Sequence, residues 1–240
     1  MEKLIYLVWL DPGATRADAA EVMLGSVAPA LLALEPHRLS MDVWDTHSDI
    51  PAPVPTPEGE TPLHALVSIW VDTIERRQPF EDVIDAAATK VAGYQVVESL
   101  YRDYGGNQWS GPRTWADGER SPGVLTVALL EQHPDLTFDE WITRWHTRIS
   151  PITEAIQPRT RYVRNAVFRG FTAGAPPFRA IVEEAWPSLE HVTDPMLFFC
   201  ADGDPEIMTA NITQMIEEIT AFTDLEKMRS VTMSEWMLKS

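Results

Sequence analysis

The stretch Leu4–Leu10 (LIYLVWL) is apolar at every position. A strand with one face in water alternates apolar and polar residues, whereas a strand covered on both faces is apolar throughout. The stretch ends at the turn signal DPG of residues 11–13, as strands commonly do. It therefore predicts a strand that is buried on both faces, and the fold has to supply both covers.

The second half of the chain repeats the first half. Three pairs of prolines are each separated by 122 residues: Pro12 and Pro134, Pro29 and Pro151, Pro36 and Pro158. Proline makes up about 5% of residues in proteins, so three such coincidences are very rare by chance. We infer an internal duplication, with a first repeat at residues 1–104, a linker at 105–122 and a second repeat at 123–240.

Each repeat is predicted as strand, helix, strand, strand, helix, strand. The expected strands cover residues 4–10, 39–44, 65–71 and 95–101, then 124–130, 161–169, 180–186 and 231–237. The later helix of each repeat is expected at 80–92 and at 205–222. The earlier helices begin near Thr15 and Thr137, where Thr137 and Glu140 have the spacing of a capping box. Pro29 and Pro151 are expected to end or kink these helices.

This βαββαβ order is that of a ferredoxin-like unit, whose helices cover only one face of the sheet. Because residues 4–10 need a cover on both faces, we expect the two sheets to pack on each other. The sequence thus predicts an α+β fold in which two ferredoxin-like repeats form one intramolecular α/β barrel. Its helices would lie outside, and its interior would be closed and apolar.

The amino-acid composition limits the kinds of partner that the protein is expected to bind. The 240 residues include 19 Lys and Arg and 36 Asp and Glu, which gives a net charge of −17. Such a surface repels phosphate backbones and acidic lipids, so we expect neither nucleic acid nor a membrane as partner. The apolar run at residues 4–10 is shorter than the roughly 18 residues of a spanning helix. The single cysteine, Cys200, cannot form an internal disulfide, which is typical of a cytoplasmic protein.

The second repeat carries a recognisable pattern. Its residues are Pro134, Thr137, Phe138, Trp141, Trp145, His146 and Pro151, and Phe222, Thr223 and Asp224 precede the last strand. On this pattern, residues 123–239 resemble the EthD-like family of the dimeric α/β-barrel superfamily. The first repeat matches more weakly, because Arg16, Ala19, Met23 and Leu24 replace Phe138, Trp141, Trp145 and His146.

The resemblance implies a barrel pocket for a small aromatic or polycyclic ligand. It also implies cofactor-free chemistry in the members that are enzymes, such as decarboxylation, dehydration or oxidation. Relatives that share only the fold of the superfamily include haem proteins. Nine tryptophans independently favour a large apolar interior with an aromatic-lined pocket.

His146 is the first candidate for catalysis. It lies four residues after Ile142 and three before Ile149, at the border of an apolar helical stripe. An imidazole at such a border can face the pocket and titrate near neutral pH, which suits a general acid or base. The alternative is a histidine that only hydrogen-bonds a neighbouring carbonyl.

Charged residues on the predicted strands supply two more candidates. Glu183 and Glu184 interrupt an apolar strand, so one of them must face inward if both faces are covered. A buried carboxylate has a raised pKa and can act as acid or base, and we take Glu183 as the candidate. The alternative is an ion pair with an arginine of the neighbouring strand. Arg164 shares a strand face with Tyr162 and would hold a substrate oxygen, unless it lies exposed at a strand edge.

The remaining candidates would line the pocket. Trp141, Trp145 and Tyr162 are expected to contact the substrate. His64 and Ser68 share a strand face and would line the other end, with core packing as the alternative. A haem would need His146 or His64 as axial ligand. We expect no metal and no cofactor.

These observations lead to one expected function and two alternatives. The expected function is a cofactor-independent lyase, a decarboxylase or dehydratase, acting on a hydrophobic aromatic or cyclic small molecule with His146 as general acid or base. The first alternative is a binding or stress-related module that carries such a ligand without turning it over. The second is a haem-dependent dehydratase or oxidase. The sequence is also compatible with a homodimer of two such barrels.

Overall fold

Eight strands form the sheet of the computed structural model, which describes residues 1–57 and 59–240. They are β1 (Glu2–Trp9), β2 (Arg38–Val43), β3 (Ala65–Val71), β4 (Lys90–Arg102), β5 (Val124–Leu130), β6 (Arg161–Gly170), β7 (Ala180–Trp186) and β8 (Arg229–Lys239). They close into a barrel in the order β1-β3-β2-β8-β5-β7-β6-β4, and every neighbouring pair is antiparallel. The predicted α+β barrel is confirmed.

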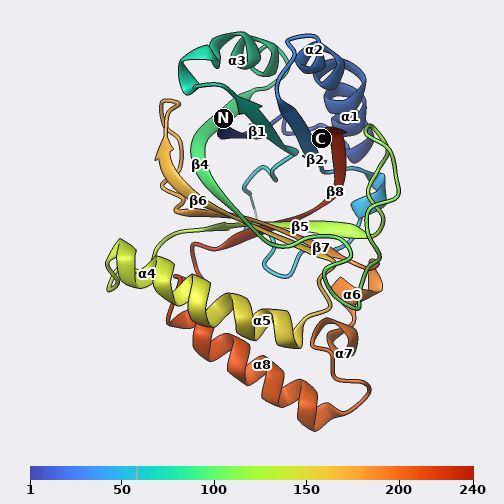
Figure 1. Ribbon diagram of the computed structural model, residues 1–240, viewed down its shortest axis with the longest axis vertical. Coiled ribbons are helices and arrows are strands. Elements are labelled where there is room, and N and C mark those ends of the chain that lie inside the picture. The colour runs from blue at the N-terminus through green and yellow to red at the C-terminus, as the bar shows by residue number, and fades with distance from the viewer. Residues whose placement is uncertain (58) are drawn as a thin grey trace.

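The helices lie outside the barrel in two groups. They are α1 (Arg16–Ala20), α2 (Ala28–Leu32), α3 (Gln78–Asp85), α4 (Phe138–Arg144), α5 (Ser150–Ile156), α6 (Glu190–Thr193), α7 (Pro195–Phe198) and α8 (Pro205–Thr220). Figure 1 shows α1, α2 and α3 on one side of the barrel and α4, α5 and α8 on the opposite side. Short 3₁₀ turns at Thr46–Ser48 and Ile74–Arg76 complete the helical segments.

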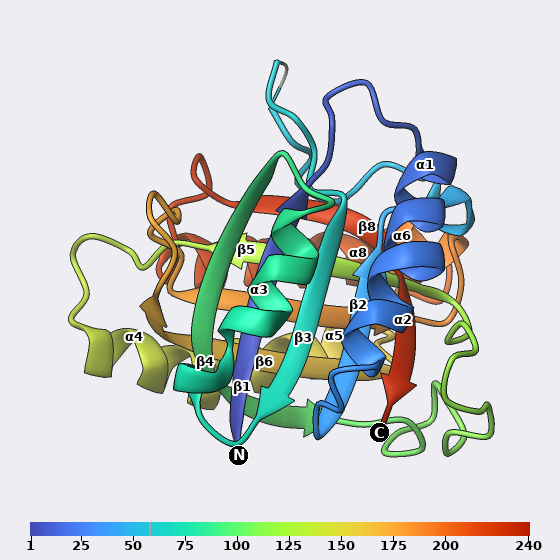
Figure 2. The same cartoon turned by 90° about the horizontal axis from the view of Figure 1, so that it is seen from above.

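The barrel is one continuous sheet. The strands β4, β1, β3 and β2 are adjacent, and so are β8, β5, β7 and β6. The two groups of strands run steeply across one another in Figure 2. We expected two sheets that only pack face to face, whereas backbone hydrogen bonds join β2 to β8 and β4 to β6. Closure gives every edge strand a partner, which an open pair of sheets would not do.

The stretch of residues 4–10 is covered on both faces, as predicted. Leu4, Tyr6 and Val8 point outward and pack in the cluster beneath α1, α2 and α3. Ile5 and Leu7 point inward and pack in the cluster that fills the barrel. The strand thus loses its alternation because each of its faces meets a separate apolar core.

The prolines do not end the first helix of either half. In each half the helix continues through a π-helical turn, at Glu21–Val27 and at Trp145–Ile149, and then resumes as α2 or α5. The Ala28 N–H bonds to the carbonyl of Met23, and the Ser150 N–H bonds to that of Trp145. The proline follows at once, near the start of the new α-helical segment, where its missing N–H costs little.

One predicted helix is too long. The helix expected over 80–92 ends at Asp85, and β4 begins at Lys90. The reason is pairing at the start of β4, where Val91 lies opposite Val8. Tertiary pairing here outweighs the helix propensity of the alanines between the two elements.

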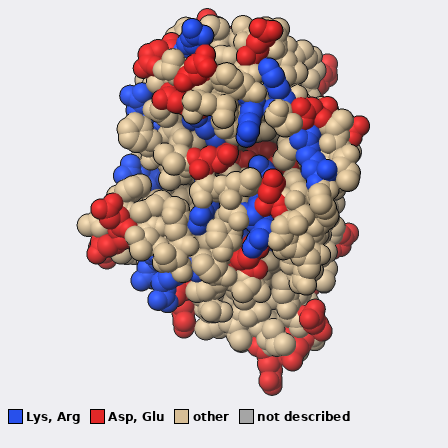
Figure 3. Space-filling view, in the orientation of Figure 1, with Lys and Arg blue, Asp and Glu red and all other residues tan. Residues whose placement is uncertain are grey.

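The barrel interior is apolar at one end only, which corrects the expectation of a wholly apolar interior. At the other end Lys3, Asp42, Glu183 and Glu235 are all at most 5% exposed. The Lys3 ammonium lies 3.2 Å from Glu183, and Arg161 donates to Glu235 at 2.7 Å. Figure 3 shows acidic and basic side chains together around the barrel opening that faces the viewer. The charges are buried as a network rather than excluded.

Asp42 is the least compensated member of this network. It is 1% exposed and lies opposite Glu235 on the neighbouring strand. Among the described residues, neither of its carboxyl oxygens has a hydrogen-bond partner. Burial raises the pKa of Asp42 well above its usual range, and the charges of Glu183 and Glu235 raise it further. This direction favours a neutral carboxylic acid.

Replacing Asp42 by Asn should therefore stabilise the protein in a pH-dependent way. An acid whose pKa is higher in the folded state takes up a proton on folding, so stability falls as the pH rises above the unfolded value of about 3.9. Asn keeps the shape of the neutral acid and has no proton to gain. We expect Asp42→Asn to change little near pH 4 and to raise the free energy of unfolding by about 1–3 kcal/mol at pH 8.

Denaturant unfolding at the two pH values measures this difference. The exposed Asp135→Asn serves as the control and should give the same small effect at both values. A loss of stability for Asp42→Asn at pH 8 would mean that the carboxylate is ionised and needed.

Candidate functional site

A cavity of about 410 Å³ lies between the outer face of the sheet in the second half and the helices that cover it. Strands β5, β7 and β8 form its floor, and α5, α7 and α8 form its walls. The residues that line it are Pro53, Val54, Thr126, Ala128, Leu130, Trp145, Ile149, Thr153, Gln157, Tyr162, Val182, Glu184, Val192, Pro195, Phe198, Phe199, Met215, Ile216, Ile219, Phe222, Thr223, Leu225, Met228 and Ser230. Its size is within the usual range for small-molecule sites.

The walls are mainly apolar and aromatic because two amphipathic helices turn their apolar stripes toward the sheet. Ile216 and Ile219 of α8 face the cavity, and Trp145 and Ile149 reach it from the π-helical turn before α5. Phe222 lies 5.0 Å from Trp141, ring centre to ring centre, in a stacked arrangement. Such a wall suits a flat, apolar ligand.

In the first half the helices pack closely on the outer face of the sheet. Met23, Leu31 and Ile84 are fully buried in one cluster with Tyr6. Met23 occupies the place in the first repeat that Trp145 has in the second, at the offset of 122 residues. The cavity lies under the helices of the second half, and Pro53 and Val54 of the first half complete its lining.

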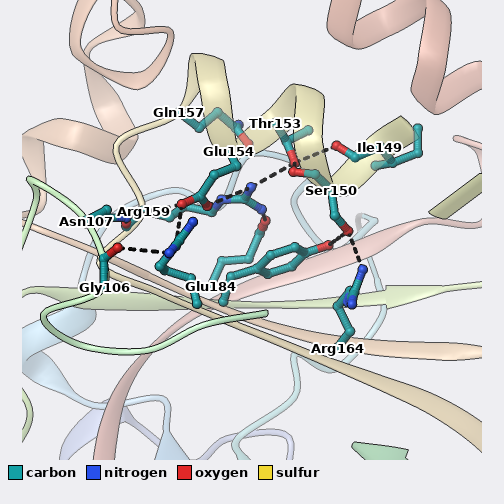
Figure 4. Close-up of polar contacts among 12 residues, drawn as sticks. Gly106, Asn107, Ile149, Ser150, Thr153, Glu154, Gln157, Arg159, Arg164 and Glu184 are labelled. Carbon is teal, nitrogen blue, oxygen red and sulfur yellow. Dashed lines mark hydrogen bonds and ion pairs between the residues drawn. The ribbon is translucent and has the colours of Figure 1, made fainter. Parts of the chain in front are cut away.

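The polar wall of the cavity is built on Arg159. Its side chain is 0% exposed and donates to Glu184 at 2.7 Å and to the Thr153 hydroxyl at 2.8 Å. The guanidinium also lies over the Tyr162 ring, 3.9 Å from its centre. Figure 4 shows Arg159 between Glu184, Glu154 and Thr153. A buried arginine thus fixes the position of a carboxylate at the cavity.

A second chain of hydrogen bonds fixes Tyr162. Its hydroxyl accepts from the Trp145 indole N–H at 2.9 Å and lies 3.4 Å from the Ser150 hydroxyl. Ser150 in turn accepts from Arg164 at 2.9 Å. Burial raises the pKa of Tyr162, so this phenol stays neutral. Tyr162 presents a rigid ring to the cavity, with its polar end already occupied.

Gln157 is a weakly bonded polar group of the wall. It is 5% exposed, and its amide nitrogen lies 3.6 Å from the Met215 sulfur. A thioether is a weak acceptor, so the amide keeps capacity for a better partner. Gln157 and Glu184 both line the cavity, where they offer a donor and an acceptor to a ligand.

His146 lies in the π-helical turn Trp145–Ile149, on the side of the helix that faces away from the cavity. It is exposed, and it is absent from the residues that line the cavity. Partial burial lowers the pKa of His146, and the positive charge of Arg164 lowers it further. The imidazole is thus neutral at neutral pH, beside the wall rather than in it.

Arg164 and Glu183 lie on opposite faces of the sheet. Arg164 points outward and is held by Ser150, by the Ser99 hydroxyl at 2.8 Å and by the Tyr101 ring at 4.8 Å. Glu183 points into the barrel. Burial by itself would raise the pKa of Glu183, but Lys3 and Arg161 outweigh burial and lower it. The ion-pair alternative for Glu183 matches these contacts, with Lys3 as an additional partner.

His64 and Ser68 lie away from the cavity. His64 is 1% exposed, accepts from the Leu10 N–H at 3.2 Å and packs against Trp44. Ser68 is 0% exposed and faces the barrel interior opposite Ile5. Trp141 is also fully buried, in the cluster behind the cavity. Of the residues predicted to contact substrate, Trp145 and Tyr162 line the cavity.

The positions of His146 and His64, the two expected axial ligands, do not suit a haem in this cavity. Neither His146 nor His64 lines the cavity, and the Nδ1 atom of His64 is already engaged by the backbone. In the described part of the chain, no group of three or more His, Cys, Asp or Glu side chains is placed to hold a metal ion. Across residues 1–57 and 59–240, no helix has the length and hydrophobicity needed to cross a membrane.

Sequence reasoning missed Arg159, Gln157 and Glu184 as parts of the site. Glu184 was available from the argument on the Glu183–Glu184 pair, because consecutive strand residues point to opposite faces. The residue that does not face inward must face the helices. Arg159 and Gln157 lie between α5 and β6, where no periodic pattern marks them.

The fold is shared with known structures. An anthrone oxidase-like protein is 12% identical, with a TM-score of 0.56, over 100% of this chain and 94% of that chain. A monooxygenase-like protein from Fusobacterium nucleatum is 10% identical, with a TM-score of 0.51, over 99% and 92%. A dye-decolorizing peroxidase from Bacteroides thetaiotaomicron is 8% identical over 99% of this chain and 93% of that chain, with a lower TM-score of 0.45.

These similarities show the fold alone. They assign no reaction and no cofactor to this chain. Neither a protein-family model nor a curated protein sequence matches. The resemblance to the EthD-like family therefore stays a prediction.

Filling the cavity should remove its ligand capacity. Ala128 lies on the floor in β5, and Ala128→Phe places a ring in the open space. We expect binding of 1-naphthol and of hydroxyanthraquinones, followed by quenching of tryptophan fluorescence, to weaken by at least about tenfold. The melting temperature should change little, since the ring enters existing space.

The control for this substitution is Ala17→Phe, which adds the same ring to the exposed face of α1. It should leave aromatic binding unchanged. Equal affinity of Ala128→Phe and the unaltered protein, at an unchanged melting temperature, would show that these probes bind elsewhere.

Proposed function

We propose that the chain is a cofactor-independent enzyme that acts on a hydrophobic aromatic or cyclic small molecule held in this cavity. The observation that carries the proposal is Glu184, a carboxylate fixed by a fully buried arginine at the wall of an otherwise apolar cavity. A carboxylate in such a place can remove a proton from a bound molecule. Trp145 and Phe222 would hold the ligand ring.

The reaction type we favour is that of a lyase. In a dehydration, Glu184 takes a proton from one carbon of the substrate, and the C–O bond on the adjacent carbon breaks. The same carboxyl group then returns its proton to the departing hydroxide, which leaves as water. In a decarboxylation, Glu184 first takes up a proton from water. The C–C bond to the substrate carboxylate then breaks, carbon dioxide leaves, and Glu184 delivers its proton to the carbanion.

The Arg159 guanidinium acts through Glu184. It holds the carboxylate in one orientation, and Gln157 offers its amide to a carbonyl or hydroxyl oxygen of the ligand. His146 stays a second candidate for the proton transfer, at the outer side of the wall next to Arg164. Glu183 is less suited, because it faces the barrel interior and is held by Lys3.

We also propose that residues 1–104 and 123–240 are ferredoxin-like repeats that superpose. Both halves have the order βαββαβ and contribute four adjacent strands. Both first helices start with a capping box, at Thr15 and at Thr137, and both contain a π-helical turn. The second repeat differs by the additional helices α6 and α7, by a later helix of 16 rather than 8 residues, and by larger aromatic residues around its cavity.

Substituting the two candidate proton carriers separately tests the function. We expect Glu184→Gln to lower turnover by about 10²–10⁴-fold, the usual contribution of general acid–base catalysis, and to keep ligand binding. His146→Gln should change turnover little. The assay follows loss of water or carbon dioxide by mass spectrometry from a panel of bicyclic and tricyclic hydroxy acids and alcohols.

The control is Glu217→Gln, which removes an exposed carboxylate of α8 without touching the cavity. Full loss of turnover in His146→Gln, with normal turnover in Glu184→Gln, would move the proton transfer to His146. Binding without any turnover across the panel would instead support a carrier of small molecules.

A further inference from the structure

A second cavity, of about 570 Å³, opens at the end of the barrel opposite the charged network. The residues that line it are Trp9, Leu10, Pro12, Thr56, Glu60, Thr61, Leu63, Thr89, Lys90, Leu129, Glu131, Pro176, Phe178, Lys227, Arg229 and Val231. They come from the end of β1, the start of β4, the end of β5 and the start of β8, which meet at one mouth of the barrel, and from the loops beside these strands.

The floor of this mouth is the apolar interior of the barrel. Leu63, Leu129, Phe178 and Val231 are between 3% and 9% exposed and belong to the cluster that fills the barrel. Among the described residues, the two cavities share no lining residue. On β5, Leu129 faces the mouth, while Ala128 and Leu130 on the other face line the first cavity. The sheet therefore separates the two spaces.

The rim of the mouth is basic, unlike the chain as a whole. Of the charged residues that line the described part of the mouth, Lys90, Lys227 and Arg229 are basic, and Glu60 and Glu131 are acidic. The whole chain has a net charge of −17. The described lining of the mouth thus has an excess of one positive charge where the apolar interior opens to solvent, which favours an anion at this position.

The ion pairs at the rim are weak enough to yield to a ligand. Arg229 lies 3.2 Å from Glu60, with side chains 25% and 53% exposed, and Lys227 lies 3.5 Å from Glu131, with side chains 54% and 24% exposed. Each pair thus has one half-exposed member, and solvent screening reduces what such a pair contributes to stability. Lys90 lies over the Trp9 ring, 4.4 Å from its centre, which holds its ammonium at the rim.

We infer that this mouth is a second binding site, for an amphipathic anion with one carboxylate or sulfonate group and a hydrocarbon or aromatic body. The body packs against Leu63, Leu129 and Val231 inside the barrel. The anionic group stays at the rim with Lys90 and Arg229, where it keeps contact with water. This site is distinct from the cavity in which the proposed reaction takes place.

Binding of 8-anilinonaphthalene-1-sulfonate, with competition by chemically matched chains, tests the site. Decanoate should displace the dye, whereas decan-1-ol and decyltrimethylammonium should displace it at least about tenfold less well. Higher salt should weaken the binding of decanoate, because its head group lies in a solvent-accessible field.

The variant Lys90→Glu/Arg229→Glu should bind the sulfonate dye and decanoate at least about tenfold more weakly than the unaltered protein does, because two charge-assisted contacts become repulsive. The control Arg38→Glu/Arg76→Glu makes the same change in net charge at exposed positions distant from the mouth and should bind normally. If the double variant does not fold, Lys90→Ala gives the same direction with a smaller effect.

The Ala128→Phe variant, in which the first cavity is filled, tests this site independently of the proposed function. Ala128→Phe should leave the binding of decanoate unchanged, even if no substrate for the first cavity is ever found. Loss of decanoate binding in Ala128→Phe, or equal binding of decanoate, decan-1-ol and the cationic chain, would overturn the inference. Normal binding by the folded Lys90→Glu/Arg229→Glu variant would overturn it as well.

Discussion

Backbone hydrogen bonding between β2 and β8 and between β4 and β6 is the constraint on which the rest of the molecule depends. Once these two seams are closed, every strand has a partner on each side, and each side chain on the sheet faces either the interior or the outer surface of the barrel. Space for a ligand is found in two kinds of place. One is between the sheet and a helix layer, where the first cavity lies, and the other is at a mouth of the barrel, where the second lies.

Much of the fold follows from the sequence because two-sided burial leaves a readable pattern. The strands β3, β5 and β7 begin and end where the apolar runs do. The start of β4 does not, because its first residues are fixed by the partner strand β1 rather than by their own propensity. The seams themselves are also invisible in the sequence. Pairing between β2 and β8 joins residues almost 200 positions apart, such as Asp42 and Glu235, and no local pattern encodes it.

The candidate site was only partly accessible from the sequence. The rule that singled out Glu183, a charge within a strand covered on both faces, applies equally to Lys3, Asp42 and Glu235, and together they form the interior network. The position of the cavity was beyond such rules. It depends on how completely side chains fill the space under each helix layer, which is decided by three-dimensional packing at positions such as Met23 and Trp145.

The π-helical turn at Trp145–Ile149 has a consequence for how the chain tolerates changes in length. A π-helical turn holds more residues than an α-helical one, so loss of a single residue there would convert it into regular α-helix. Each residue of an α-helix advances by about 100° around the axis. A one-residue deletion within the turn would therefore keep α4 and α5 in phase, whereas a deletion in α4 between Trp141 and the turn would rotate Trp141 by that amount and out of the core. Loss of one residue should be tolerated better in this turn than in the α-helical segments on either side of it.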